Sequence, residues 1–264
     1  MTVTPVDNFS PFESPMLLIE GAKTSLVNFE SCCNAFIQNC TYDTIRYKDP
    51  KSGDKVVKLR FHHRMPPKLR LSAYRILNDL RHALDQAVCD GAISLGRANA
   101  KDVYFPIGRT SQDFDREISK KCKNVHPNLI AFIKTCRPYE GGDDLLYALS
   151  RLAGPNKHQR IVGMSINHTG LQLELTSNAF IPHADLRPLR PNQWNELRNE
   201  LEFMRTGPGA QGHIDPVPVL QIVLGDGAPP LSEPAFTSLN TLASKVETIV
   251  LGFEAETARI LQAD

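Results

Sequence analysis

The sequence lacks any apolar stretch long enough to cross a membrane, so no membrane association is expected. Its first fifteen residues contain three prolines and have neither the basic start nor the apolar core of a signal peptide, which favours a cytoplasmic location. The six cysteines show no Cys-x-x-Cys spacing, which argues against a disulfide framework and a zinc ribbon. Glycine-rich nucleotide loops, Gly-x-Ser-x-Gly and His-Glu-x-x-His are also missing. We therefore expect no metal and no organic cofactor.

The spacing of apolar residues predicts a mostly α protein of the α+β class. Apolar residues recur at intervals of three and four over 16–40, 68–95 and 235–262, with shorter helices expected within 110–152. This spacing is typical of helices that pack along one another, so the two ends of the chain should pair in one bundle. We predict one domain over 1–264, composed of a loose arm (1–15), a helical part with an inserted basic hairpin (16–160, hairpin 43–62), a small β section (161–230) and a last bundle helix (233–262).

The helix predicted at 68–95 has one apolar face and one polar face. The apolar face, which includes Ile76 and Leu80, should lie in the core. The polar side chains form a line along the other face, with two more on its flank: Arg75, Asn78, Asp79, His82 and Gln86, then Arg81 and Asp85. Such a line is either a solvated helix face or one wall of a functional site.

Basic charge is concentrated just before this helix. Residues 46–70 include nine lysines and arginines against two acids. Alternating residue types predict a hairpin that turns its basic side chains to one outer face, namely Arg46, Lys48, Lys58 and Arg60. This face would bind RNA or another polyanion, or it would protect an exposed edge strand from pairing.

The last third of the chain is expected to form strands. Residues 161–167 and 171–176 are predicted as two strands around a turn at His168 to Gly170, and 214–224 as another. The spacing of Trp194, Leu197 and Leu201 predicts a short helix between them.

A polar loop follows the Gly154-Pro155 break. Asn156, Lys157, His158 and Arg160 could present a cation, an imidazole and an amide to one point, as a phosphate or oxyanion site requires. An ordinary solvated loop is the alternative.

Four segments in order resemble an uncharacterised bacterial family whose members tend to read NLRSALDH, FPI, LQPY and DKHR. Here they read NDLRHALDQ (78–86), YFPI (104–107), RPY (137–139) and NKHQR (156–160). The first segment is in turn similar to the Arg-x-x-x-x-His helix of the HEPN superfamily. Those helical proteins include metal-independent RNases of toxin and phage-defence systems.

The resemblance implies an RNA-directed protein, either a metal-independent endoribonuclease or a toxin, which could form a homodimer. Arg81 takes the arginine position, but Gln86 stands at the histidine position and Asn156 at the aspartate of the last motif. Proton transfer would then need His82 or His158, with the 156–160 loop folded back so that His158 lies near Arg81, Asp85 or His82. The binding residues would be Arg75, Asn78, Asp85, Asn156, Lys157, Arg160, Lys58 and Arg60. The competing interpretation is a non-catalytic binding or scaffold protein, which Gln86 favours.

Overall fold

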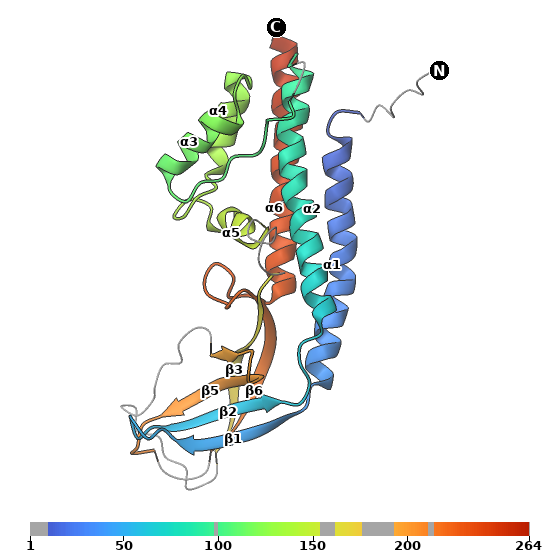
Figure 1. Ribbon diagram of the computed structural model, residues 1–264. Coiled ribbons are helices and arrows are strands. Elements are labelled where there is room, and N and C mark those ends of the chain that lie inside the picture. The colour runs from blue at the N-terminus through green and yellow to red at the C-terminus, as the bar shows by residue number, and fades with distance from the viewer. Residues whose placement is uncertain (1–9, 98–99, 154–161, 176–192, 211–213, 264) are drawn as a thin grey trace. The chain divides into compact units, whose positions relative to one another are not determined.

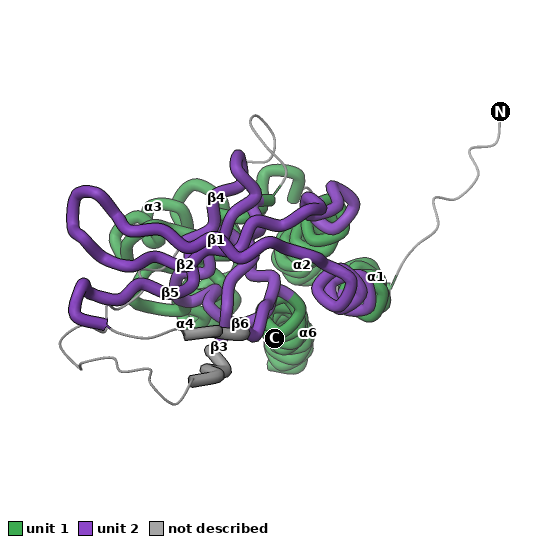
Figure 2. Tube along the Cα trace, turned by 90° about the horizontal axis from the view of Figure 1, so that it is seen from below, with its two compact units in different colours: residues 1–29, 71–162, 236–264 green, residues 30–70, 163–235 purple. Residues whose placement is uncertain are grey.

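The computed structural model describes residues 10–97, 100–153, 162–175, 193–210 and 214–263. It is mostly helical with small antiparallel sheets, which confirms the predicted α+β class. The chain divides into two compact units, coloured separately in Figure 2: a helical unit (1–29, 71–162 and 236–264) and a β unit (30–70 and 163–235). That the chain is one domain stays a prediction. Within the described residues, no helix has the length and apolar character needed to cross a membrane.

Three long helices, most of whose residues belong to the helical unit, run side by side (Figure 1): α1 (Glu13–Asn39), α2 (Pro67–Ser94) and α6 (Ala235–Ala263). The predicted apolar face of α2 is fully buried, and Ile76, Leu80 and Ala87 have no exposed surface. An ion pair of 2.6 Å between Lys23 and Glu247 links α1 to α6. The expected pairing of the two chain ends in one bundle is therefore confirmed.

Shorter helices pack against this bundle: α3 (Ser111–Lys121), α4 (Pro127–Cys136) and α5 (Asp144–Ala153). The side chain of Thr110 caps α3 by accepting a hydrogen bond from the Asp113 N–H. At Gly252, α4 comes so close to α6 that an added Cβ would lie 2.4 Å from the ring of Phe132. That ring meets Phe253 edge to face, with centroids 5.0 Å apart. Because Gly252 has no Cβ, α4 can pack against α6 at this position.

The β unit contains a four-stranded sheet and a two-stranded sheet. The strand orders are β1-β2-β5-β4 and β3-β6, with β1 (Tyr42–Lys48), β2 (Lys55–Phe61), β3 (Met164–Leu175), β4 (Trp194–Asn195), β5 (Glu200–Thr206) and β6 (Ile214–Leu224). The predicted hairpin and the strand at 214–224 are confirmed. The predicted turn at His168 to Gly170 is wrong, because β3 continues through it with only a shift of register against β6.

The short helix predicted from Trp194, Leu197 and Leu201 is also wrong. Trp194 lies in β4 and pairs across the sheet with Leu201 of β5. Leu197 is 87% exposed in the turn between these strands. The three residues therefore share no helix face, and their spacing of three and four is a coincidence of a strand, a turn and a strand.

The predicted single basic face of the hairpin is wrong as well. Arg46 lies opposite Val57, whereas Lys58 lies opposite Ile45. Residues directly opposite each other in an antiparallel pair point to the same face, so Arg46 and Lys58 point to different faces. The expectation treated each strand separately and missed this register. β2 is also a central strand, paired with β1 and β5, so its lysines and arginines do not protect an edge.

Candidate functional site

Arg81 and Asp85, predicted as site residues, form an ion pair on α2 that holds an irregular segment of the chain. Arg81 Nη2 lies 2.9 Å from Asp85 Oδ1 and donates a 2.7 Å hydrogen bond to the backbone carbonyl of Phe105. The same Asp85 oxygen accepts a 2.9 Å hydrogen bond from the Phe105 N–H. We call these three residues the Arg81 clamp. Both backbone groups of a fully buried phenylalanine are satisfied by one charged pair.

Cys89, one turn after Asp85 on α2, holds the same irregular segment. The Cys89 thiol lies within hydrogen-bond distance of the Ala100 and Val103 carbonyls, at 3.4 and 3.2 Å. Burial raises the pKa of this thiol to about 11, so it stays a proton donor at neutral pH. Positions 81, 85 and 89 follow one another by one helical turn, and together they hold the segment that includes the Phe-Pro-Ile motif. This segment packs on the helices, with Val103 and Phe105 buried.

Burial dominates the electrostatics of Asp85. It raises the pKa of this carboxyl, although the Arg81 guanidinium and the Phe105 N–H both act in the opposite direction. The second terminal nitrogen of Arg81, Nη1, is buried and has no hydrogen-bond partner among the described residues. The clamp thus lies inside the helical unit.

Gln86, at the position where the resemblance expects a histidine, contacts α1. Its Oε1 accepts a 2.8 Å hydrogen bond from the hydroxyl of Ser14. One turn later, Asp90 accepts a 3.1 Å hydrogen bond from the Phe12 N–H. The end of the polar line on α2 therefore serves to fix the beginning of α1.

The earlier part of that line is more open. Arg75 and His82 are exposed, and Asn78 donates to the carbonyl of Tyr74 on its own helix at 2.9 Å. Burial raises the pKa of Asp79, while charge attraction from His82 and Arg75 lowers it. His82, Arg75 and Asp79 thus form a partly exposed polar group. The loop candidates Asn156, Lys157, His158 and Arg160 lie outside the described residues, so a joined site with α2 stays a prediction.

Acidic residues of β5 lie beside the two hairpin residues proposed for binding. Arg60 donates to Glu200 at 2.7 Å, and the Lys58 ammonium lies 3.8 Å from Glu202. Arg205 then bonds Glu202 at 2.9 Å. The basic charge of β2 is therefore largely compensated within the β unit.

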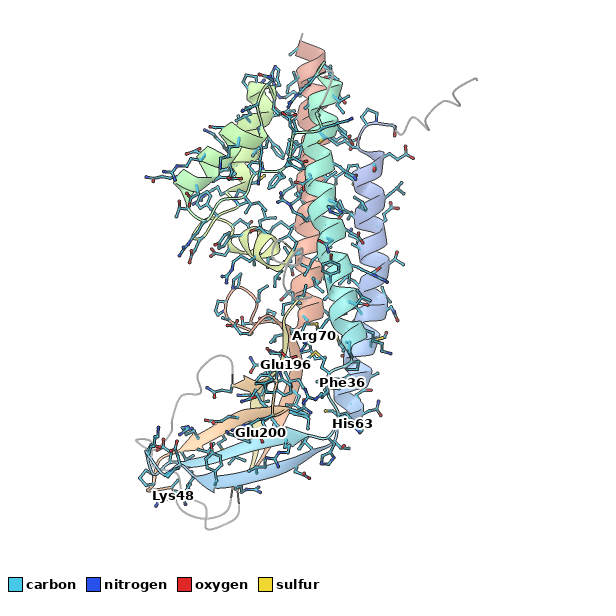
Figure 3. All side chains as sticks on the ribbon, viewed as in Figure 1. Phe36, Lys48, His63, Arg70, Glu196 and Glu200 are labelled. Carbon is cyan, nitrogen blue, oxygen red and sulfur yellow. The ribbon has the colours of Figure 1, made fainter. Side chains whose placement is uncertain are left out.

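The β unit contains a pocket that sequence reasoning missed. It has a volume of about 350 Å³ and is partly open. It is lined by residues before and in the first turn of α2, by β4 and by the β4–β5 turn: Arg64, Met65, Pro67, Arg70, Trp194, Glu196 and Asn199. Arg70 Nη1 and Glu196 Oε1 form an ion pair of 2.7 Å, and Figure 3 shows these two side chains together. No motif could reveal this pocket, because its two halves are more than 120 residues apart in the chain.

Comparison with known proteins adds no relative to this description, since no family model, no curated protein and no solved structure matches the chain.

Proposed function

We propose that the chain is a non-catalytic binding protein rather than a nuclease. The observation that carries this proposal is the engagement of Arg81 in the clamp. An arginine that stabilises a phosphorane must offer accessible N–H groups to the phosphate, whereas Arg81 Nη2 is shared between Asp85 and the Phe105 carbonyl and Arg81 Nη1 is buried. Gln86 adds support, because a side-chain amide does not act as an acid or base near neutral pH and this one is bonded to Ser14.

The ion pairs of Lys58 and Arg60 also indicate which kind of partner the chain would bind. A polyanion binds tightly when lysines and arginines neutralise its phosphates and release the counterions condensed on it, and Lys58 and Arg60 already have carboxylates beside them. This favours a small ligand over RNA. An RNA partner, a homodimer, a cytoplasmic location and a role in bacterial defence stay predictions.

The alternative function is a metal-independent ribonuclease or toxin, and one observation favours it. Arg75 and His82 are exposed and lie close enough to Asp79 to affect its pKa. In this alternative, Arg75 holds a phosphate, His82 transfers the proton from the RNA 2′-hydroxyl, and the clamp is structural.

An assay of the purified full chain on labelled RNA, with and without a chelator, distinguishes the two functions. For a binding protein we expect no cleavage above the background of the His82→Ala variant, and a lower melting temperature for Arg81→Ala. Chelator-resistant cleavage that His82→Ala or Arg81→Ala abolishes, in a variant that melts like the parent, would refute the binding proposal.

A further inference from the structure

Two residues that line the pocket of the β unit carry nitrogen donors that no described residue uses. The indole Nε1 of Trp194 and the guanidinium Nε of Arg70 are buried, and neither has a hydrogen-bond partner among the described residues. Buried donors without partners are uncommon in proteins because each costs the free energy of its lost hydration. Two of them on residues that line one pocket indicate an acceptor group that arrives from outside.

The walls of the pocket are built to stay in place. Trp194 packs edge to face on Phe61, with ring centroids 5.7 Å apart. Asn199 adopts a left-handed backbone with φ of 57°, and its side-chain amide donates to the carbonyls of Phe61 and His63 at 2.7 and 3.1 Å. Met65, also in the lining, is 7% exposed. The aromatic ring and the β4–β5 turn are therefore fixed before any ligand binds.

The charges of the lining set the charge of the ligand. Arg64 and Arg70 face a single carboxylate, that of Glu196, so one positive charge is left over. Glu196 bonds only one terminal nitrogen of Arg70, and its side chain is 52% exposed. A carboxylate matches the planar geometry of a guanidinium and also accepts from an indole N–H. The volume lies at the small end of ligand sites, and Met65 and Trp194 offer apolar surface.

We propose that this pocket binds a small monocarboxylate with an apolar body, whose carboxylate bonds Arg70 and the Trp194 indole while its body packs on Met65. This inference rests on the proposed binding function and names its ligand class. Glu196 acts as an internal competitor, because its carboxylate already occupies one end of the same guanidinium.

Trp194 makes the test direct, since it is the only tryptophan of the chain and its fluorescence reports on the pocket alone. We expect benzoate, phenylacetate or hexanoate to change the emission of the full chain saturably. Benzamide, which keeps the ring of benzoate but loses the charge, should bind at least about tenfold more weakly, equal to about 1.4 kcal/mol. No saturable change with any of the three acids up to tens of millimolar, or equal binding of benzoate and benzamide, would overturn the proposal.

Two variants and a matched control test the residues. Arg70→Gln should weaken benzoate about tenfold, and Glu196→Gln should strengthen it about threefold by removing the competitor. Lys68→Gln removes the same charge from an exposed residue two positions away that does not line the pocket, so it should change affinity less than twofold. Equal losses in Arg70→Gln and Lys68→Gln would mean general charge attraction and would refute the site.

Folding and specificity controls complete the experiment. If Arg70→Gln fails to fold by circular dichroism, the Glu196→Gln gain and the benzoate to benzamide ratio decide the matter. Inorganic phosphate or an RNA oligonucleotide that changes the emission as strongly as benzoate would contradict the carboxylate assignment. RNA cleavage would refute the proposed function but leave this result standing, so the two failures are distinguishable.

Discussion

Replacing Arg81 by alanine tests whether the clamp is structural. The substitution removes the guanidinium that bonds both the Asp85 carboxylate and the Phe105 carbonyl. Within the clamp, Asp85 then keeps only the hydrogen bond from the Phe105 N–H, and burial already disfavours its charged form. Phe105 loses one of the two side chains on α2 that satisfy its backbone.

The expected loss of stability follows from these contacts. A hydrogen bond to a charged group contributes about 1.5–3 kcal/mol, and removing one partner of a fully buried ion pair costs about 3–5 kcal/mol. The side chains of Arg81 and Asp85 keep 18% and 21% exposure, so water can solvate part of what is left. We therefore expect Arg81→Ala to lower the free energy of unfolding by about 2–3 kcal/mol.

Urea denaturation followed by circular dichroism of the helices measures this change. Arg75→Ala is the matched control, because it makes the same substitution at an exposed position of the same helix and should stay within about 0.5 kcal/mol. A double-mutant cycle of Arg81→Ala with Asp85→Ala should give a coupling energy of about 1 kcal/mol or more. If Arg81→Ala unfolds at the same urea concentration as Arg75→Ala, the clamp does not stabilise the fold and the structural role is refuted.

Three further predictions concern the pH response, the packing of α4 on α6 and an ion pair of the β unit. Because the pKa of Asp85 is raised, the folded state binds this carboxyl proton more tightly than the unfolded state does. The stabilisation that this proton gives the folded state is present below about pH 3.8 and is lost as pH rises through the folded pKa. Asp85→Asn should remove this loss of stability from acid denaturation curves. Gly252→Ala should lower the free energy of unfolding by about 1–3 kcal/mol through overpacking, measured by thermal melting. Gly21→Ala, where an added Cβ has nothing within 4 Å, should be neutral or slightly stabilising in the same measurement. Arg60→Ala removes the partner of a buried β5 carboxylate and should cost about 1–3 kcal/mol in urea denaturation followed by Trp194 fluorescence; no change would mean that the pair is only a surface contact.

Local patterns in the sequence were enough to predict the elements that depend on local physics. The buried face of α2 and the strand at 214–224 each follow from the spacing of apolar residues. The wrong predictions concern segments whose structure depends on pairing with residues far away in the sequence. β5 was missed because Leu201 faces the core from a strand that pairs with β2, about 140 residues earlier.

In the candidate site, too, local contacts could be predicted from the sequence and long-range contacts could not. The pairing of Arg81 with Asp85 could be predicted from their spacing of four on one helix. Its partner, the Phe105 backbone, could not, because that contact depends on how an irregular segment returns to α2. The pocket was not predictable either, since Arg70 and Trp194 meet only through the tertiary fold of the β unit.

The clamp also gives a physical reason for the order of two motifs. A segment without regular structure must find partners for its buried N–H and C=O groups, and α2 provides them from positions 81, 85 and 89. This arrangement needs an arginine and an aspartate four residues apart, followed at some distance by a Phe-Pro-Ile segment that packs on the same helix. It makes no demand on position 86, where Gln86 meets α1 instead. A chain can therefore keep the fold that the Arg and Asp stabilise while having no proton-transfer group at that position.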